Sequence, residues 1–348
     1  MFNHKKQKIN NGFSLIELLV AMTLGLFLIG GAITMFMSNS RTYNEQVSMS
    51  RLQENARFAL DILMRDIRIA GYSGCSDDFN SVTNNISVDA KQLLSFINAI
   101  EGIEQDSTTW KPSASTENIT SIKAGTDGIA VRYFQNLSPL TAAMTTIESD
   151  LTIDATAAGG LLKSGDLLAV SDCGSADIFA LSADENAGII KHAEVVTNGT
   201  NNTTGNLSKL YLLDSSLMRV ISRRYIIKDA TNGQPSLFRI QYLKDATTDN
   251  FSVIEQELIP GVDNMQILYG IATGVGDRLP DTYAKASDVT QWNNVVSVRL
   301  ALLLSTETDN FSALETSHNL LGEVILSNDK RRRRMYTATV KIRNRFTD

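Results

Sequence analysis

The N-terminal part of the chain changes from a continuous apolar run to an amphipathic pattern. Residues 18–37 form a run of twenty positions without a charged side chain. At about 1.5 Å rise per residue, a helix of that length spans the roughly 30 Å hydrocarbon core of a bilayer. Further along, apolar side chains recur every three to five positions, at Val47, Leu52, Ala56, Ala59, Leu63, Ile67 and Ala70. This spacing predicts one apolar helix face that ends near Gly71. No proline interrupts residues 13–70, so we expect one long helix, lipid-facing at first and then packed on a globular head.

From residue 119 onward the pattern becomes that of β-strands, with runs rich in Val, Ile and Tyr between Gly, Asn and Asp. The predicted strands are Gly128–Phe134, Asp166–Ser171, Asp177–Leu181, Lys209–Leu213, Met218–Ile227, Ser236–Tyr242, Val253–Ile259, Met265–Tyr269, Val295–Leu304 and Arg333–Arg345. Side chains alternate between the two faces of a strand. The core face predicted for the last strand consists of Tyr336, Ala338, Val340, Ile342 and Asn344. The fold class is therefore α+β: a long N-terminal helix packed on a large, mostly antiparallel β-sheet head.

Two segments without a periodic pattern are predicted to be loops. Residues 73–118 are rich in Ser, Asp, Asn and Thr, and their apolar island at 93–100 is interpreted as a short helix or strand. Residues 195–206, VVTNGTNNTTGN, hold few hydrophobic side chains and predict an exposed hairpin or loop tip.

Composition and charge place the chain among membrane-anchored globular proteins. Of the 348 residues, 43% are hydrophobic and 20% are charged, which excludes a disordered or collagen-like chain. Residues 1–12 carry Lys5, Lys6 and Lys8 and no acidic side chain. A basic stretch before an apolar helix keeps that end in the cytoplasm, so we expect the head on the other side of the membrane.

The two cysteines, Cys75 and Cys173, both lie in the expected head. Disulfides persist outside the cytoplasm, so a Cys75–Cys173 bridge is favoured over two separate buried thiols. The bridge closes a loop of about 100 residues, for which the chain-entropy model gives about 4–5 kcal/mol and real bridges often give less.

The residues at the entrance of the apolar run, GFSLIE at 12–17, resemble the processing and methylation motif of type IV prepilins and type II secretion pseudopilins. The family pattern is Gly, Phe, Ser or Thr, Leu, any residue and Glu before a long apolar helix, and it is complete here. The resemblance implies that a prepilin peptidase cleaves between Gly12 and Phe13 and methylates the Phe13 amine. It also implies that the Glu17 carboxylate pairs with the Phe13 ammonium of an adjacent subunit. Such a pair fixes the axial register, because a charge left unpaired at membrane depth is costly.

Four further segments look like the PilW group of minor pilins, and they are residues 53–72, 258–270, 293–304 and 331–345. The first also resembles, more distantly, the J subunit of type II secretion. Residues 75–205 are covered poorly. The resemblance implies four regions: a cleaved basic leader (1–12), a transmembrane and assembly helix (13–37), its amphipathic continuation (38–72) and a periplasmic β-rich head (73–348).

By this resemblance the protein is a minor pilin, held in the bacterial inner membrane and then incorporated at the initiating tip of a type IV pilus. A bulky head is easier to place at a tip than in a packed shaft. The expected partners are other minor pilins, the major pilin, the prepilin peptidase, the inner-membrane assembly platform and the membrane. A J-type pseudopilin of type II secretion and a tip adhesin or DNA-uptake subunit stay open as alternatives. Loss of the leader changes the formal charge from −6 to −6 − 3 = −9, which disfavours nucleic-acid binding.

No enzymatic activity, cofactor or metal site is predicted. The histidines His4, His192 and His318 lie far apart in the sequence. GYSGC at 71–75 is one glycine short of a nucleophile elbow and follows a helix. GIATGVGD at 270–277 is interpreted as a flexible loop, with Asp277 and Asp281 as alternative Ca²⁺ ligands.

A run of charge, Lys330–Arg334, has two interpretations. As a structural feature it begins an edge strand, where charge discourages aggregation and balances acids on the head. The alternative is contact with acidic neighbouring subunits or with DNA phosphates.

Overall fold

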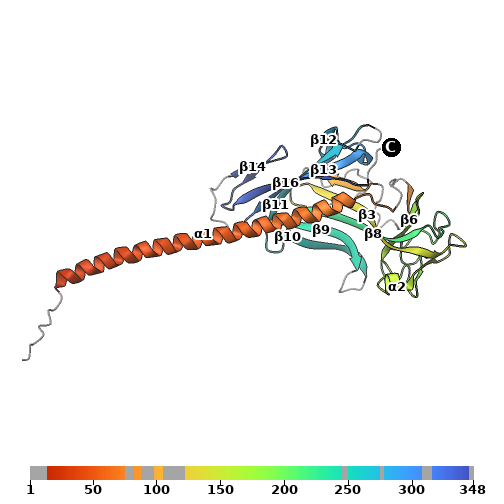
Figure 1. Ribbon diagram of the computed structural model, residues 1–348, viewed down its shortest axis with the longest axis horizontal. Helices are drawn as coiled ribbons and strands as arrows, with labels where there is room; N and C mark the ends of the chain where they lie inside the picture. The colour runs from red at the N-terminus through yellow and green to blue at the C-terminus, as the bar shows by residue number, and fades with distance from the viewer. Residues whose placement is uncertain are drawn as a thin grey trace, which may run out of the picture. The chain divides into compact units, whose positions relative to one another are not determined.

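The computed structural model describes residues 14–74, 81–87, 98–104, 122–244, 250–274, 278–307 and 316–344 (Figure 1). The chain divides into two compact units, Met1–Arg51 and Leu52–Asp348. One helix, α1 (Leu15–Ile69), extends through both, as predicted. It ends before Gly71, whose φ of 79° is a left-handed conformation that glycine adopts readily.

In the first unit, α1 exposes its apolar side chains. Every position from Ser14 to Asn44 except Gly25 is exposed. Phe27 is 82% exposed and Leu28 is 76% exposed. The helix contains an apolar window of which nothing is buried, and it is long and apolar enough to cross a membrane. Because an apolar surface of this extent is costly in water, lipid or other apolar helices are its expected surroundings.

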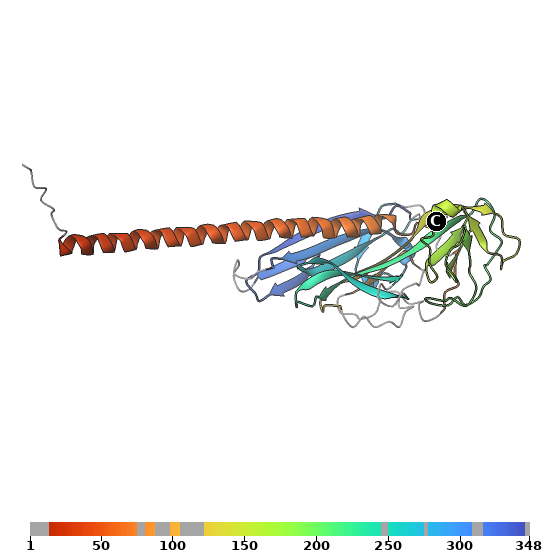
Figure 2. The same ribbon diagram turned by 90° about the horizontal axis from the view of Figure 1, so that it is seen from below.

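In the second unit, α1 buries one face against the head (Figures 1 and 2). The buried apolar residues of this part are Leu52, Ala56, Ala59, Leu63 and Ile67, followed by Ala70 beyond the helix end. These residues belong to the apolar face predicted from the sequence, so that prediction is confirmed.

Ten strands form the larger sheet of the head. They are β1 (Val82–Asn84), β2 (Ile100–Ile103), β3 (Gly128–Ala142), β4 (Leu151–Ile153), β5 (Leu167–Ser171), β6 (Ala176–Ala180), β7 (Ile189–Ile190), β8 (Ser216–Asp229), β9 (Pro235–Lys244) and β10 (Phe251–Pro260). The order is β1-β6-β5-β8-β3-β4-β7, while β2 pairs with β3, β9 with β8 and β10 with β9. Among the described pairs of this sheet only β1–β6 is parallel, which agrees with the predicted antiparallel head.

A four-stranded sheet and a hairpin complete the head. The sheet has the order β12-β11-β13-β16, and the hairpin joins β14 to β15. Their bounds are β11 (Val262–Ile271), β12 (Thr282–Ala284), β13 (Val295–Ser305), β14 (Thr316–Leu320), β15 (Glu323–Ser327) and β16 (Arg333–Lys341), with short 3-10 helices at Ala286–Asp288 and Trp292–Asn294. The core face predicted for β16 is confirmed. Val340 and Ile342 are buried, and Tyr336, Ala338 and Asn344 are half-buried.

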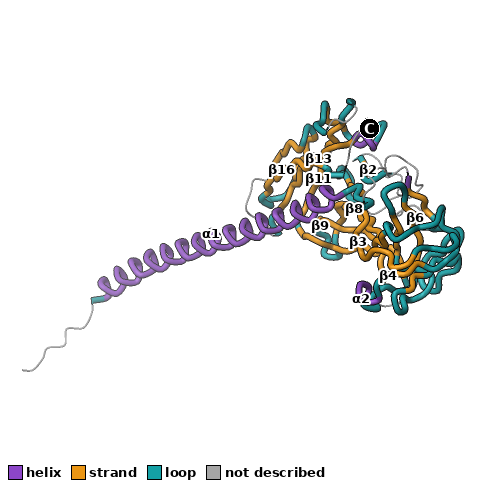
Figure 3. The backbone as a smooth tube through the Cα atoms, turned by 45° about the vertical axis from the view of Figure 1, so that its right-hand side comes forward, coloured by secondary structure: helices purple, strands orange, loops and turns teal. Residues whose placement is uncertain are grey.

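Two of the apolar cores in the described part of the head lie on opposite faces of β5 and β6. The main core contains the buried face of α1 and includes Leu167 and Ala169 of β5. The small core includes Leu168 and Val170 of the same strand. Because both faces of β5 are covered, all five of its residues are buried and the first four, Leu167 to Val170, are apolar. Figure 3 shows that loops surround the end of the head that holds β4 and the short helix α2 (Ala155–Ala158).

The structure contradicts predictions about local structure in two segments. Residues 73–118, predicted to be a loop apart from the island at 93–100, contain the strand β1. The segment Lys209–Leu213 is a loop and not a strand, and within it the Tyr211 hydroxyl donates to the buried Asp177 carboxylate. Residues 195–206 form a loop with many exposed positions, as predicted, but a buried side chain anchors this loop to the head. Asn202 is 2% exposed, and its side-chain amide bonds to both backbone groups of Ala180. The apolar island at 93–100 lies outside the described residues except for its end, where Ile100 begins β2.

Candidate assembly site

The first turn of α1 is closed by a reciprocal pair of hydrogen bonds. The Ser14 N–H donates to Oε2 of Glu17 at 3.0 Å, and the Ile16 N–H donates to the Ser14 Oγ at 3.3 Å. This arrangement is a capping box, which satisfies N–H groups that have no partner inside a helix. Glu17 therefore has a structural role within its own chain, which the sequence motif did not reveal. Gly12 and Phe13 lie outside the described residues, so their cleavage and methylation stay predictions.

Polar side chains within the apolar part of α1 are satisfied by the helix itself. The Thr23 hydroxyl lies 3.0 Å from the Leu19 carbonyl oxygen and 2.9 Å from that of Val20. The Thr34 hydroxyl donates to the Gly31 carbonyl oxygen at 2.8 Å. A hydroxyl bonded in this way leaves no unpaired donor toward hydrocarbon. The Glu17 carboxylate is thus the ionisable group at the start of an otherwise neutral stretch.

At its other end, α1 is joined to the head by a buried carboxylate. Asp66 is 3% exposed. It accepts a hydrogen bond of 2.5 Å from the Tyr225 hydroxyl, and Nη1 of Arg223 lies 3.1 and 3.0 Å from its two oxygens. The Tyr133 hydroxyl lies 3.4 Å from Oδ1. A buried carboxylate is tolerated only when paired, so this cluster fixes the register of α1 on β3 and β8.

The Asp66 charge affects the pKa values of the tyrosines in this cluster. Burial, with the Asp66 charge added to it, raises the pKa of Tyr133 to about 12. The same two causes raise the pKa of Tyr225. Burial by itself lowers the pKa of the Arg223 guanidinium. The attraction of the Asp66 carboxylate outweighs this effect, so the pKa is raised. The guanidinium is therefore charged and both phenols are neutral at ordinary pH. Sequence reasoning missed Asp66, although an acid directly before the apolar-face residue Ile67 was an available signal.

The end of α1 is capped by the segment that follows the final strand. The Arg343 N–H donates to the Arg68 carbonyl oxygen at 3.0 Å, and the Asn344 side-chain amide donates to that of Ile69 at 3.2 Å. The last carbonyl groups of a helix have no hydrogen-bond donor within the helix. Here residues near the C-terminus of the chain provide the donors. This contact joins sequence-distant segments and had no signal in the sequence.

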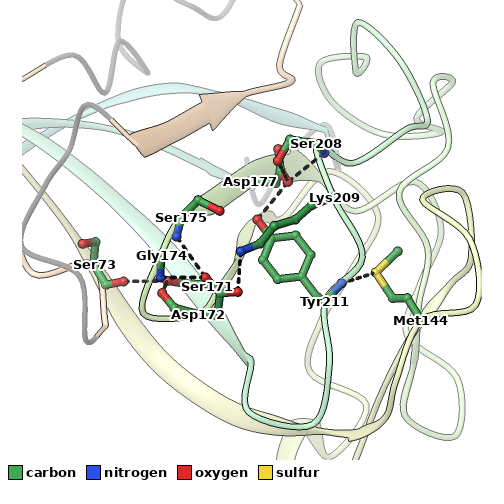
Figure 4. A network of polar contacts seen from close by, with 10 residues as sticks. All are labelled: Ser73, Met144, Ser171, Asp172, Gly174, Ser175, Asp177, Ser208, Lys209 and Tyr211. Carbon is green, nitrogen blue, oxygen red and sulfur yellow. Dashed lines mark hydrogen bonds and ion pairs between the residues drawn. The ribbon is translucent and has the colours of Figure 1, made fainter.

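A second polar network lies beside the predicted disulfide (Figure 4). The Ser171 hydroxyl donates to the Ser73 carbonyl oxygen at 2.8 Å. Oδ1 of Asp172 accepts from the N–H groups of Gly174 and Ser175 at 2.8 and 2.9 Å, and its Oδ2 pairs with Lys209. The loop that carries Cys173 is therefore held in place. Cys75 lies outside the described residues, and the Cys75–Cys173 bridge stays a prediction.

In the same network a fully buried carboxylate, Asp177, holds the loop before β8. Its Oδ2 accepts from the Ser208 N–H at 2.9 Å, the Ser208 hydroxyl at 2.7 Å and the Tyr211 hydroxyl at 2.9 Å. The Tyr211 N–H contacts the Met144 sulfur at 3.4 Å (Figure 4). Burial, together with the Asp177 charge, raises the pKa of Tyr211. All of these groups are used for hydrogen bonding, so their role is to hold the fold.

The charged run Lys330–Arg334 is arranged as the first interpretation predicts, at the start of an edge strand. Arg333 begins β16, which is the edge strand beside β13. Its guanidinium bonds to Asp263 at 2.5 Å and to the two oxygens of Asp329 at 2.5 and 2.8 Å. The most buried cation of the run is thus neutralised by acids of the head.

The remaining candidate ligands and histidines do not come together. Within the described ranges, no group of three or more His, Cys, Asp or Glu side chains is arranged to hold a metal ion. Asp277 and His4 lie outside those ranges, and Asp281 accepts hydrogen bonds from the backbone and hydroxyl of Thr273. His192 is buried in the small-core region and His318 lies in β14.

Two family models match the chain, one in the C-terminal part of the head and one near the N-terminus. Residues 224–344 match the family model of the type IV pilus-assembly protein W, PilW. Residues 7–33 match that of the prokaryotic N-terminal methylation motif. No curated protein and no solved structure matches the chain. The first match covers β9 to β16 of the head, and the second covers the end of the leader and the exposed start of α1. These two matches, together with the long apolar helix and the antiparallel head, support a type IV minor pilin of the PilW family.

Proposed function

We propose that this minor pilin is processed between Gly12 and Phe13, methylated on Phe13 and anchored once in the inner membrane with its head in the periplasm. From there it enters the initiating tip complex of a type IV pilus. The family match implies assembly with other pilins and the pilus machinery. The specific partners we propose are other minor pilins, the major pilin, the prepilin peptidase and the inner-membrane platform. Its role is structural, without enzymatic activity.

The observation that carries this proposal is the position of Glu17. It lies at the start of an exposed apolar helix, with Leu15 and Ile16 beside it at 81% and 69% exposure. Oε2 of Glu17 is engaged by its own chain, and among the described residues no donor reaches Oε1. An ammonium from a neighbouring chain can therefore bind the carboxylate without breaking the cap. The resulting charge pair favours one axial register in the low dielectric of a helix bundle.

The proposal is tested by substitutions at the motif, with a matched control on the same helix. Gly12→Leu is expected to leave the leader attached, which an immunoblot detects as a slower band. Glu17→Ala is expected to leave processing intact and to abolish surface pili, counted by electron microscopy. Glu54→Ala changes an exposed acid of α1 in the second unit and is expected to leave both readouts unchanged. Normal piliation in both motif variants contradicts the proposal.

The tip position is tested separately. A bulky head is hard to repeat along a packed shaft, so the protein is expected at one end of isolated pili, where immunogold labelling detects it. Gold along the whole shaft contradicts the tip position. Deletion is expected to remove pili while protein secretion continues. The opposite phenotype, intact pili with lost secretion, assigns the protein to type II secretion. Binding of DNA or host ligands by the purified full chain supports the adhesin or uptake alternative.

We also propose the Cys75–Cys173 bridge. The Ser73–Ser171 hydrogen bond brings the backbone two residues before each cysteine together. A bridge there joins the end of α1 to the turn between β5 and β6. Removal by Cys75→Ser is expected to lower the unfolding free energy by about 2–4 kcal/mol. Equal denaturation midpoints for oxidised and reduced wild-type protein exclude the bridge.

A further inference from the structure

The strands β13 and β16 of the four-stranded sheet have one buried face and one accessible face (Figure 1). Leu300 of β13 and Val340 of β16 belong to the main core. Because side chains alternate along a strand, their neighbours in the sequence point to the other face. On that face Thr337, Thr339 and Lys341 of β16 are exposed. The accessible face is therefore polar along β16.

Three cations lie on or beside this accessible face. In the antiparallel register, Arg299 of β13 is opposite Thr339, and Lys341 of β16 is opposite Ser297. Arg299 and Lys341 are therefore diagonal neighbours, which in such a ladder are about 7–8 Å apart. Arg343, two residues beyond Lys341, is also exposed. We call Arg299, Lys341 and Arg343 the basic face.

No acid of the described part of the chain neutralises the basic face. None of its three cations forms an ion pair with a described residue. Acids elsewhere on this side of the head are already engaged, since Asp263 pairs with Arg333 and Glu323 pairs with Lys285. The whole chain has a formal charge of −6, so this local excess of positive charge is opposite in sign to the rest.

Arg299 is held in a position from which it can bind a carboxylate. Its guanidinium carbon lies 4.0 Å from the centroid of the Tyr283 ring. The Ser297 hydroxyl donates to the Tyr283 hydroxyl at 3.3 Å, which helps to fix that ring. Among the described residues, no acceptor bonds to the Arg299 side chain. A guanidinium restrained in this way loses little freedom when its paired N–H groups bind a carboxylate.

We propose that the basic face docks an acidic segment of another pilin in the assembled tip complex. The inference rests on the proposed function, which supplies pilin neighbours. Arg299 provides paired donors for one carboxylate, and Lys341 and Arg343 provide point charges. The exposed hydroxyls of Thr337 and Thr339 add neutral hydrogen bonds. Carboxylates of the partner offset the repulsion among the three cations, which nothing in the described chain offsets.

Charge reversal tests the docking against a purely structural role of the cations. The double variant Lys341→Glu, Arg343→Glu is expected to lower the number of surface pili at least about tenfold, because like charges then meet at the interface. Its denaturation midpoint, measured on the full chain in detergent, is expected to be unchanged or raised. A lowered midpoint assigns the two cations to the fold and overturns the docking.

A matched control for the double variant is Lys191→Glu, which changes an exposed lysine in the segment after β7 and is expected to leave pili unchanged. Normal piliation in the double variant, in cells where Glu17→Ala abolishes pili, overturns the basic face as a docking site and leaves the proposed function standing. Normal piliation in Glu17→Ala itself counts against the proposed function.

Photocrosslinking identifies the occupant directly. A photoreactive amino acid placed at Thr339 in piliated cells is expected to join this chain to another pilin, at a peptide that contains Asp or Glu. The yield is expected to fall in the double variant. No protein adduct, or an adduct between two copies of this chain, overturns the proposal.

Nucleic acid is the other polyanion to exclude. A long duplex extends beyond the basic face onto an acidic chain, so a local acidic segment fits the face better. A labelled DNA duplex is therefore expected to show no binding to the purified full chain that the double variant removes. Binding of the duplex that the double variant abolishes assigns the face to nucleic acid and overturns the proposal.

Discussion

The two parts of α1 are one helix that follows two different packing rules. From Ser14 to Asn44 every position except Gly25 is exposed, and the exposed side chains include large apolar ones such as Phe27 at 82% exposure. From Leu52 onward one face is buried, and it includes the small residues Ala56 and Ala59, both 0% exposed. Small side chains let a helix approach a sheet closely, whereas large ones cover apolar surface against lipid or other helices. The first part therefore suits apolar surroundings such as lipid or other helices, and the second suits one fixed register on the head.

The largest effect is expected from a substitution that removes the contact fixing this register. Asp66→Ala leaves Arg223 and two buried phenols without their acceptor, so the unfolding free energy is expected to fall by about 3–5 kcal/mol. Guanidinium denaturation of the full chain in detergent measures this, with the fluorescence of the buried Trp292 as the signal. An unchanged midpoint would show that α1 is held by its apolar face alone.

The same chemical change in the two parts of α1 is expected to have different results. Leu63 is 0% exposed, so Leu63→Ala creates a cavity and is expected to cost about 2–5 kcal/mol of head stability. Leu28 is 76% exposed, so Leu28→Ala is expected to leave the denaturation midpoint of the head unchanged. The two variants are compared in one denaturation series. Equal midpoints for both would remove the distinction between the two parts.

Alkaline pH is expected to weaken the anchor of α1 without a mutation. The pKa of Tyr133 in the folded head is about 12, above the usual value for tyrosine of about 10. Its neutral form is therefore favoured by folding. That contribution is complete below about pH 10 and is lost as the pH rises through about 12. Tyr133→Phe removes the ionisable group and is expected to flatten part of this loss in the denaturation midpoint. An equally steep loss in the variant would assign it elsewhere.

The smallest expected effect concerns the exposed side of the same helical segment. Arg65 and Asp61 form an ion pair of 2.7 Å, with side chains 71% and 57% exposed. Exposed pairs at this spacing contribute about 0.3–0.5 kcal/mol. Asp61→Ala is expected to lower stability by no more than that, and it is the matched control for Asp66→Ala, five residues away. A cost similar to that of Asp66→Ala would mean that exposed charges also fix the helix.

The sequence predicted the apolar and amphipathic parts of α1, nearly all of the long strands and the core face of β16, because each has its own periodicity. Short strands such as β1 and β7 were not predicted, since they are too brief to show a period. Lys209–Leu213 was wrongly predicted as a strand from its apolar and aromatic side chains, and in the structure it is a loop in which Tyr211 bonds to Asp177. The polar anchors Asp66, Asp177 and His192 were not recognised, since each depends on partners far away in the sequence.

By itself, the sequence determined the membrane-length helix, its acidic entrance at Glu17 and the antiparallel head. These features depend on neighbours within a few residues, which hydrophobic periodicity and local motifs record directly. The folded chain was needed to see that Asp66 anchors the helix and that Arg343 and Asn344 cap it. The same is true of the His192 ring, which lies between the carbonyl oxygens of Gly205 and Ser149. A carboxylate, a carbonyl or an imidazole is costly to bury alone. Its role is therefore set by the partners that folding brings to it from distant segments.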